Sequence, residues 1–460
     1  MSNMKKKVSD FVEFEESNNL YQKEIHGLKF WTYVRFSVFW SLFTDQIFDG
    51  REVSIFKLIF KYTLSFFQGL YNLLKLSNKK YDLVFINTSG RTNTIDNKNV
   101  DIYTYPIIKQ LSDKYKILLM DVTKYDNCKE YPCDFLPMRF VSIFHRVFSR
   151  ILKLTEEEEN YLDKLNINKL FSNEVNISQI VSTEIKHHKI NYKIYKTILK
   201  RLSPKVLFYT NNGVMGGVIQ AANELGIKTI ELQHGEISHL HVAYNSEKFD
   251  DKVIPKYLFT FGRYWHETIK FRSEKIAVGF PYMEFMQEKL SENIARKENA
   301  IVVISQGKLG RDLFIKITIE ILENLKDCEI YYKLNPSECN DWKEFYPSSF
   351  QSLANIKMID NNDKPLYYYF RKAKYLIGSG STCLYEGLVN DMIVFNVKSN
   401  FSANTTKLID EKAMFVVQDA QEILSKIKSK KVPLGKINKE DMFKSNSLIN
   451  VEQAVEQILQ

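Results

Sequence analysis

Short apolar runs alternate with amphipathic stretches along this chain from residue 81 to residue 417. The runs are rich in Val, Ile, Leu, Tyr and Phe, which is typical of strands buried on both faces of a parallel sheet. The stretches between them repeat apolar residues at helical spacing, so we expect helices there. This alternation predicts an α/β fold with parallel sheets built from strand–helix–strand units.

The pattern divides into two halves near residue 285, where the charged stretch 288–299 is typical of a linker or connecting helix. The predicted strands of the first half are 81–86, 206–209, 229–232, 257–261 and 275–278, and those of the second are 301–304, 329–334, 356–359, 375–377, 393–395 and 415–417. A chain of 460 residues is too long for one core. We therefore expect two Rossmann-like domains, 81–285 and 286–435, with an N-terminal extension at 1–80 and a C-terminal segment at 436–460.

Specific residues predict two helix boundaries. Gly226 follows the apolar periodicity of 214–225 and suits a helix C-cap. Thr155 and Glu158 have the spacing of a capping box at the start of an acidic helix. The run 186–189, Lys-His-His-Lys, is interpreted as a solvated helix face, because adjacent histidines on a helix point in different directions.

The N-terminal extension carries a different pattern. Residues 53–80 contain five lysines, six aromatic residues and no carboxylate, with polar positions at helical steps. Such a helix can lie in a membrane interface with its lysines toward anionic head groups. Packing on the protein's own core is the other interpretation. The aromatic segment 30–43, whose only charge is Arg35, is either a second membrane contact or the helix that pairs with the first.

Composition and charge narrow the function classes. The net charge is +9, from 64 Lys and Arg against 55 Asp and Glu, which suits an anionic substrate or membrane surface. No Arg-rich stripe or RNA-binding signature accompanies it, so we do not expect nucleic acid as a partner. The five cysteines form no Cys-x-x-Cys pair, which argues against a zinc site or a disulfide scaffold. Acidic residues occupy the place of a signal peptide's apolar region, so we expect a cytoplasmic protein.

The most informative motif is a run of small and hydroxylated residues between 378 and 387. A predicted strand precedes this run and apolar residues at helical spacing follow it, which indicates a strand-to-helix turn. The start of a helix presents free N–H groups, so the turn predicts an anion site, for phosphate above all. The residues expected to contribute are Ser379, Gly380, Ser381 and Thr382.

Other polar loops follow the ends of predicted strands, at the edge where ligands bind in open parallel sheets. The loop at 305–310 offers Gly307 and Lys308, and Arg311 follows it. The loop at 87–93 is either a binding loop, with Gly90 and Arg91, or an ordinary turn.

A histidine stands at the end of the predicted strand 229–232. His234 is followed by Gly235, which lets another group approach, so it is suited to acid–base chemistry. A structural role is the alternative for a single histidine. Glu231 and Glu236 are the nearest carboxylates in the sequence.

Three motifs in this order resemble a GT-B glycosyltransferase of the kind that builds bacterial capsule, O-antigen or teichoic-acid polymers. The segment 232–235, Leu-Gln-His-Gly, is similar to the His-Gly motif of capsule transferases and of the CDP-glycerol glycerophosphotransferase family. The segment 333–336, Lys-Leu-Asn-Pro, is similar to the His-Pro motif of polysialyltransferases and Kdo transferases. Ser381 and Thr382 with Glu386 match their Ser-Ser/Thr motif and its downstream acid.

One position departs from that family. Asn335 stands before Pro336 where the family usually has histidine. Asparagine can hydrogen-bond a phosphate, but it carries no positive charge and donates no titrating proton. We expect Lys333, or Lys308 and Arg311, to supply the missing cation.

The resemblance implies two Rossmann-like domains that face each other across a cleft, with the last helix crossing back onto the first domain. The nucleotide of an activated sugar would lie on the second domain, with its phosphate at the Ser-Thr pair and its ribose hydroxyls at Glu386. His234 would act as general base on the acceptor hydroxyl, with Glu231 and Glu236 as fallback bases. The chain has no Asp-x-Asp triplet, so neither a metal nor another cofactor is expected.

The leading hypothesis is a glycosyltransferase that uses a nucleotide sugar, such as CMP-linked Kdo or a sialic-type acid. Its acceptor would be a growing capsule or lipopolysaccharide glycan or a lipid-linked molecule at the inner face of the cytoplasmic membrane. Two alternatives stay open: a CDP-glycerol or CDP-ribitol phosphotransferase of the same fold, and a nucleotide-sugar-binding assembly protein without catalysis. An NAD-dependent dehydrogenase is disfavoured, because no Gly-x-Gly-x-x-Gly follows the first strand.

Overall fold

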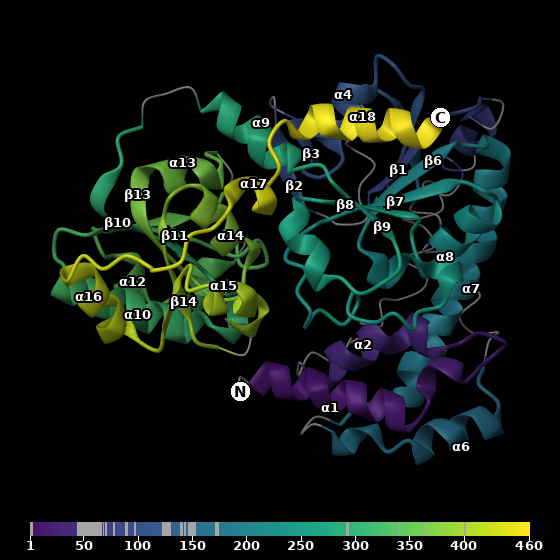
Figure 1. The fold of residues 1–460 in the computed structure, drawn as a ribbon, viewed down its shortest axis with the longest axis horizontal. Coiled ribbons are helices and arrows are strands. Elements are labelled where there is room, and N and C mark those ends of the chain that lie inside the picture. The colour runs from purple at the N-terminus through teal and green to yellow at the C-terminus, as the bar shows by residue number, and fades with distance from the viewer. Residues whose placement is uncertain are drawn as a thin grey trace. The chain divides into compact units, whose positions relative to one another are not determined.

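The structure is a computed structural model that describes residues 3–43, 67, 69, 71–76, 79–87, 91–95, 98–121, 130–138, 141, 144–145, 153–170, 174–290, 294–339, 341–361, 363–399 and 402–460. The chain divides into two compact units (Figure 1). The first unit holds 5–281 and 446–460, and the second holds 282–445. Each unit has a parallel sheet of its own.

In the described residues, seven parallel strands form the sheet of the first unit, in the order β5-β4-β1-β6-β7-β8-β9. Their bounds are β1 (Leu83–Asn87), β4 (Ile117–Asp121), β5 (Asp134–Pro137), β6 (Val206–Thr210), β7 (Lys228–Leu232), β8 (Tyr257–Thr260) and β9 (Glu274–Ala277). The direction in which successive strands are added reverses between β1 and β6, which are neighbours. Ligands of open α/β sheets bind at the carboxyl ends of the strands at such a reversal.

Helices of the first unit cover its sheet and bury its apolar side chains. They are α4 (Tyr105–Leu111), α7 (Ile177–Leu202), α8 (Asn212–Glu224) and α18 (Ser447–Leu459). Helix α6 (Glu156–Lys164) packs instead against α7. Leu207 of β6 shares a buried cluster with Leu199 of α7 and Ile219 of α8. Helix α18, the yellow helix of Figure 1, lies at the C-terminal end of the sequence and packs against α4.

Both helix boundaries predicted from specific residues are confirmed. Thr155 caps α6 and completes a capping box with Glu158, and Gly226 follows α8 with a φ of 73°. The prediction of a solvated face at 186–189 is wrong for His188, which is only 6% exposed. This histidine lies on the side of α7 that packs on α8, and a Cβ at Gly216 would lie 3.4 Å from its Nδ1.

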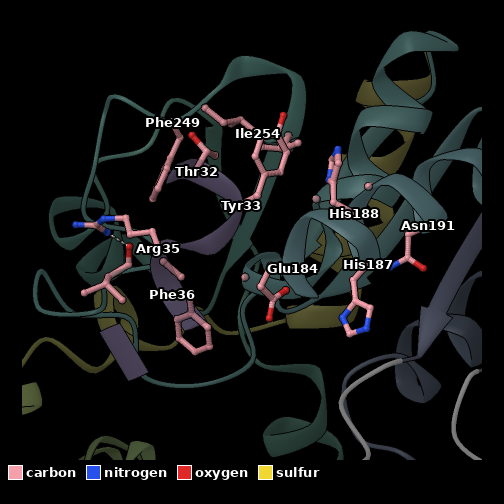
Figure 2. Close-up of a pocket in the computed structure, with 16 residues that line it drawn as sticks. Thr32, Tyr33, Arg35, Phe36, Glu184, His187, His188, Asn191, Phe249 and Ile254 are labelled. Carbon is pink, nitrogen blue, oxygen red and sulfur yellow. Dashed lines mark hydrogen bonds between the residues drawn. The ribbon is translucent and has the colours of Figure 1, made fainter. Parts of the chain in front are cut away.

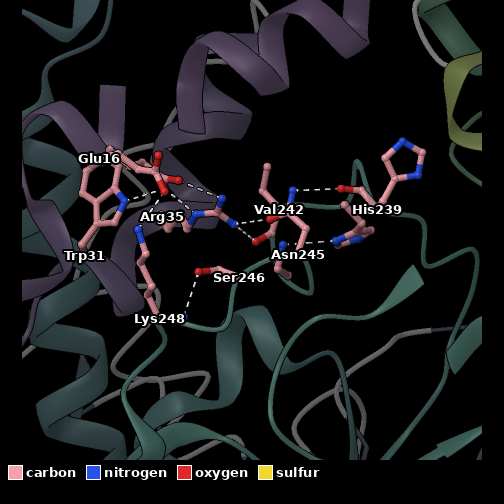
Figure 3. Close-up of polar contacts among 11 residues, drawn as sticks. Glu16, Trp31, Arg35, His239, Val242, Asn245, Ser246 and Lys248 are labelled. Atoms are coloured by element: carbon pink, nitrogen blue, oxygen red, sulfur yellow. Dashed lines mark hydrogen bonds and ion pairs between the residues drawn. The ribbon is translucent and has the colours of Figure 1, made fainter. Parts of the chain in front are cut away.

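Two N-terminal helices, α1 (Asn3–Ser17) and α2 (Trp31–Phe43), pack on the first unit around a buried ion pair. The Arg35 guanidinium donates Nη2–H to Glu15 Oε2 at 3.0 Å, and its Nε pairs with the other oxygen of the same carboxylate. It also donates to the Val242 carbonyl and, at 2.7 Å, to Asn245 Oδ1 (Figure 3). Trp31 also donates to Glu15 at 2.6 Å. The Glu15 carboxylate therefore joins α1 to α2, and the Arg35 guanidinium joins α2 to the loop after β7.

Only part of the predicted helix at 53–80 lies in the described residues. Within it, Leu73 and Leu76 belong to the core cluster of the first unit. Phe67, Tyr71 and Leu74 are 62%, 66% and 55% exposed. In the part of the chain that the structure describes, no helix is long and apolar enough to cross a membrane.

The second unit contains a six-stranded parallel sheet in the order β12-β11-β10-β13-β14-β15, counted over the described residues. Its strands are β10 (Lys297–Ile304), β11 (Glu329–Lys333), β12 (Ile356–Ile359), β13 (Ala373–Gly378), β14 (Ile393–Val397) and β15 (Phe415–Val417). Its helices are α9 (Pro281–Lys289), which starts at the unit boundary, α10 (Arg311–Asn324), α11 (Trp342–Phe345), α12 (Ser348–Gln351), α13 (Leu366–Lys372), α14 (Thr382–Val389), α15 (Thr406–Asp410), α16 (Ala420–Lys428) and α17 (Lys439–Met442). Here the reversal of strand order lies between β10 and β13.

The fold class predicted from the sequence is confirmed, and three features of the fold were not predicted. Strand β10 begins at Lys297, inside the stretch 288–299 that was interpreted as a linker or helix, because its first three residues are exposed and give no apolar run. Strands β4 and β5 were not singled out. The antiparallel hairpin of β2 (Thr92–Ile95) and β3 (Lys98–Asp101) lies where only a loop was expected.

The buried ion pair gives a stability prediction. Replacing Glu15 by Ala leaves the Arg35 guanidinium buried without its carboxylate, so we expect the free energy of unfolding to fall by about 3–5 kcal/mol. Chemical denaturation measures this loss. The neighbouring Glu16 is the matched control, because its ion pair with Lys248 is exposed on both sides and its removal should leave stability unchanged. Equal stability of the Glu15→Ala and Glu16→Ala variants would contradict the structural role given to Arg35.

Candidate functional site

The second unit brings two glycine-bearing loops together where its strand order reverses. Strands β10 and β13 are hydrogen-bonded neighbours, with Val303 opposite Ile377. Both end at the carboxyl edge of the sheet, so the loops at 305–310 and 379–381 leave it side by side. This is the place where open α/β sheets bind nucleotides.

Helix α14 begins directly after β13 and presents its amino terminus at this edge. Ser381 is its N-cap, in an extended conformation, and its hydroxyl accepts a hydrogen bond from the Cys383 N–H at 3.3 Å. Gly380 has a φ of 56°, a value that favours glycine. A Cβ at Gly387 would lie 2.2 Å from Leu376 Cδ2, so the buried Leu376 side chain would have to shift to admit a larger residue. Thr382 opens the helix and is half-buried.

Two residues of the predicted phosphate and ribose site make their hydrogen bonds inside the protein. Ser379 is 1% exposed, and its hydroxyl donates to the Val397 carbonyl at 2.8 Å and bonds to Ser399 Oγ at 2.7 Å. Its hydroxyl therefore joins the ends of β13 and β14 instead of facing a ligand. Glu386 is 7% exposed and accepts a hydrogen bond from Tyr367 at 2.6 Å, so a contact with ribose stays a prediction.

The loops after β10 and β11 form the neighbouring wall. Gly307 has a φ of 65°, and a Cβ there would lie 3.9 Å from Asn335 Cγ, so the two loops are close. The Asn335 side-chain oxygen accepts from the Ser337 N–H at 3.1 Å and bonds to its hydroxyl at 2.9 Å. Pro336 is exposed beside it. The side-chain oxygen of Asn335 thus stabilises the turn in which this residue lies.

The three cations predicted to replace the missing histidine have different surroundings. Lys333 is half-buried and donates to the Asn361 carbonyl at 2.8 Å, and burial lowers the pKa of its ammonium. Arg311 pairs with Glu338 at 3.3 Å, and this carboxylate also accepts from Ser305 at 2.5 Å. Lys308 is exposed, 5.8 Å from the centre of the Phe345 ring. Lys308 is therefore the cation of this set that solvent reaches most freely.

In the first unit, the structure brings Arg91 against the backbone of His234. Arg91 donates to the His234 carbonyl at 2.8 Å, and the Tyr103 hydroxyl donates to the same oxygen at 2.5 Å. The Tyr103 and His234 rings meet edge to face at 6.4 Å. Gly90, the other residue predicted in that loop, lies outside the described residues. Arg91 thus positions the histidine through its backbone.

The environment of His234 keeps its imidazole neutral. Burial, with the positive charge of Arg91 and the nearby His241, lowers the pKa of His234 to about 3. Its Nδ1 is buried and makes no hydrogen bond in the part of the chain that the structure describes. A neutral ring can accept a proton, as a general base must.

The two carboxylates near this histidine differ in environment. Glu231 is fully buried on β7 and accepts a hydrogen bond from the Tyr244 hydroxyl, which suits a structural residue. Burial raises the pKa of Glu236 to about 8, partly offset by a hydrogen bond from Ser238. Glu236 is therefore mostly protonated at neutral pH and would act as an acid more readily than as a base.

No sequence pattern predicts a small pocket in the first unit, because its walls come from α2, α7, α8 and the loop at 242–254 (Figure 2). Glu184 lies on its wall, accepts a hydrogen bond from Ser37 at 2.8 Å, and has a pKa raised by burial. The side chains that Figure 2 labels are Thr32, Tyr33, Arg35, Phe36, Glu184, His187, His188, Asn191, Phe249 and Ile254.

Hydrogen bonds fix the tautomer of His188 in this pocket. Gln220 donates its amide to Glu224 at 2.8 Å, so its oxygen faces His188 Nε2, also at 2.8 Å. Nε2 therefore carries the proton, and burial lowers the pKa of His188 to about 4. Among the described residues, no group of three or more His, Cys, Asp or Glu side chains is arranged to hold a metal ion.

No protein-family model matches this chain, and no curated protein matches it. Solved structures match its fold. A proposed UDP-N-acetylglucosamine 2-epimerase from Listeria monocytogenes is 9% identical, with 82% of this chain and 96% of that chain covered and a TM-score of 0.52. The UDP-GlcNAc 2-epimerase of Methanocaldococcus jannaschii in complex with UDP-GlcNAc and UDP is 13% identical, with 82% and 98% covered and a TM-score of 0.48. MurG of Acinetobacter baumannii is 12% identical, with 82% and 98% covered and a TM-score of 0.43.

The likeness to the Listeria protein shows the fold alone, which is the GT-B type with two Rossmann-like domains. The chain spans nearly the whole of that protein. Together with the strand order of both sheets, it confirms the fold class predicted from the alternating sequence pattern.

The raised pKa of Glu236 predicts a pH-dependent stability. The folded protein holds this proton up to about pH 8, whereas an ordinary glutamate loses it near 4.5. The contribution of this proton to the free energy of unfolding is therefore fully present below pH 4.5 and is lost as the pH rises toward 8. The free energy of unfolding of the wild type should fall by about 5 kcal/mol across this interval, and we expect the Glu236→Gln variant to lack this fall.

Chemical denaturation at a series of pH values checks this expectation. Glu247→Gln, at an exposed position a short way along the chain, is the control and should keep the wild-type slope. If Glu236→Gln and the wild type lose stability in parallel, Glu236 is not the buried acid described here.

Proposed function

We propose that this protein is a glycosyltransferase that moves a sugar from a nucleotide donor to a growing surface glycan. The observation that carries the proposal is the amino terminus of α14 at the strand-order reversal of the second unit. Free N–H groups at a helix start bind phosphate, and Gly380, with a φ of 56°, precedes the cap of this helix. Exposed Lys308 in the adjacent loop would add positive charge.

The donor's diphosphate or monophosphate would contact the α14 amino terminus, with Thr382 and the Gly307 loop on either side. No metal is needed in this mechanism, because charge developing on the leaving phosphate would meet fixed N–H donors and Lys308. Glu386 would receive ribose hydroxyls if Tyr367 gives up its hydrogen bond or shares the carboxylate. The sequence motifs favour a cytidine nucleotide, with Kdo or a sialic-type acid as the sugar.

His234 would remove the proton from the acceptor hydroxyl. An imidazole whose pKa is about 3 is a weak base, so the bound substrates have to raise that pKa. Negative charge on a substrate bound beside the ring would do so, since it stabilises the protonated form. Arg91 and Tyr103 would keep the ring in place through its backbone carbonyl. Glu236 would be the fallback group.

The acceptor is proposed to be a capsule or lipopolysaccharide glycan or a lipid-linked molecule at the cytoplasmic face of the inner membrane. The lysine and aromatic residues at 53–80 support peripheral membrane contact. The exposure of Phe67, Tyr71 and Leu74 agrees with a role for this segment at an interface.

Three other functions compete with this proposal. A CDP-glycerol or CDP-ribitol phosphotransferase would use the same phosphate turn. A nucleotide-sugar-binding assembly protein would use it without turnover, and Asn335 in place of histidine favours that possibility. The name of the Listeria neighbour adds a UDP-N-acetylglucosamine 2-epimerase, which would change the sugar without needing an acceptor.

A thermal-shift panel with CMP, CDP, UDP and GDP tests the donor. A nucleotide that binds the folded protein but not the unfolded chain raises the protein's melting temperature by mass action. We expect CMP or CDP to raise it most. Lys308→Ala should weaken this effect, with apparent affinity falling about threefold to tenfold, and Lys316→Ala on α10 is the exposed control. Stabilisation by UDP or GDP alone overturns the cytidine assignment.

Replacing His234 by Ala tests the transferase mechanism. We expect turnover to fall by a factor of about 10²–10⁴ while nucleotide binding is retained, because the base acts on the acceptor and not on the donor. His266→Ala in the same unit is the control, since that half-buried histidine bonds to Thr260 at 2.8 Å. Wild-type turnover in the His234→Ala variant contradicts the assignment. Absence of turnover in the wild type with every donor, despite tight binding, supports the assembly protein.

A further inference from the structure

A basic segment between α16 and α17 exposes two apolar side chains on the second unit. Val432 is 63% exposed and Leu434 is 84% exposed. Figure 1 shows this segment as an extended yellow coil that follows α16. We call residues 428–436 the lysine loop.

Hydrogen bonds hold both ends of the lysine loop, so its tip is fixed in an exposed position. The Lys431 N–H donates to the Lys426 carbonyl at 3.0 Å, which closes the end of α16. The Gly435 N–H donates to the Lys412 carbonyl at 2.9 Å. A Cβ at Gly435 would lie 1.8 Å from the carbonyl oxygen of Glu411. Glycine alone fits this anchor. Between the two anchors the chain has only Val432, a proline and Leu434.

Lysines predominate around this tip, although the Glu298 carboxylate interacts electrostatically with Lys430 and the Glu411 backbone contacts Gly435. From residue 423 to residue 439 the chain has six lysines and no carboxylate. Four of them, Lys428, Lys430, Lys431 and Lys436, are exposed and form no ion pair with any residue that the structure describes. Lys426 lies over the Phe415 ring and Lys439 pairs with Asp391. The lysine loop therefore presents positive charge on both sides of an apolar tip.

We propose that the lysine loop binds the surface of an anionic phospholipid bilayer, with Val432 and Leu434 inserted among the head groups. Lysines attract anionic head groups and exposed aliphatic side chains gain by leaving water, so the two act together at such a surface. A protein partner fits less well, because protein interfaces are depleted in lysine and enriched in aromatic residues. The loop also lacks the aromatic side chains on which nucleic-acid bases stack.

The position of the lysine loop leaves the phosphate turn unobstructed. Its Gly435 anchor bonds to Lys412, which precedes β15, so the loop lies at the amino ends of the strands. The turn before α14 lies at their carboxyl ends. Membrane binding through the loop and ligand binding at α14 thus use opposite edges of one sheet. This inference does not depend on the proposed transferase activity.

Co-sedimentation of the full-length protein with vesicles tests the inference. The vesicles are phosphatidylcholine alone and phosphatidylcholine mixed with phosphatidylglycerol. We expect binding to the mixed vesicles only. Replacing the four exposed lysines by Gln should lower the affinity at least tenfold, since each lysine beside an anionic surface contributes roughly a factor of five. Val432→Ser with Leu434→Ser should also lower it, whereas Leu434→Trp should preserve it.

Matched variants separate this surface from general effects. Lys164, Lys169, Lys193 and Lys200 are exposed lysines of the first unit, and replacing them by Gln removes the same charge elsewhere. Ile449→Ser removes an apolar side chain that is 53% exposed on α18. Both controls should bind as the wild type does. The proposal is overturned if the control and loop variants lose equal vesicle affinity, or if the loop variants bind vesicles as the wild type does. The second result would assign any membrane contact to another segment.

Discussion

Every strand of a parallel sheet ends at the same edge, and this constraint determines where the candidate site can be. In each unit the strand order reverses once between neighbouring strands, at β1 and β6 in the first and at β10 and β13 in the second. The connections on the two sides of a reversal diverge, so space opens above the carboxyl ends there. The candidate phosphate turn lies at the second of these places.

Close packing makes that turn possible. Because Gly387 allows α14 to lie directly on Leu376 of β13, the helix can begin within a few residues of the end of the strand. Ser381 then caps the helix with its own hydroxyl, while Ser379 fastens the strand end to β14. The N–H groups of the first helical turn are thereby held at a fixed position, and a phosphate that binds there meets donors that are already oriented.

The sequence was sufficient to predict the fold class and the strand-end placement of the motifs, because both follow from local periodicity. Contacts between residues far apart in the sequence were not predictable in this way. Glu338 neutralises Arg311 across 27 positions, and the partner of Lys333 is a carbonyl 28 positions away. His188 was misinterpreted because its burial depends on a glycine-rich face of α8, which the local pattern of α7 does not reveal. The spacing of Ser379 likewise could not show that its hydroxyl is used inside the sheet.

The amino terminus of α14 is where we expect phosphate to bind, and a crystal structure of the protein with a bound nucleoside phosphate tests this most directly. We expect a phosphate oxygen within hydrogen-bonding distance of the Thr382 N–H, and of the Cys383 N–H in place of the Ser381 hydroxyl, with Lys308 turned toward the phosphate. Soaking CMP and UDP into parallel crystals would also identify the base. A phosphate bound instead at the end of β1 in the first unit, with the α14 terminus empty, would contradict the account.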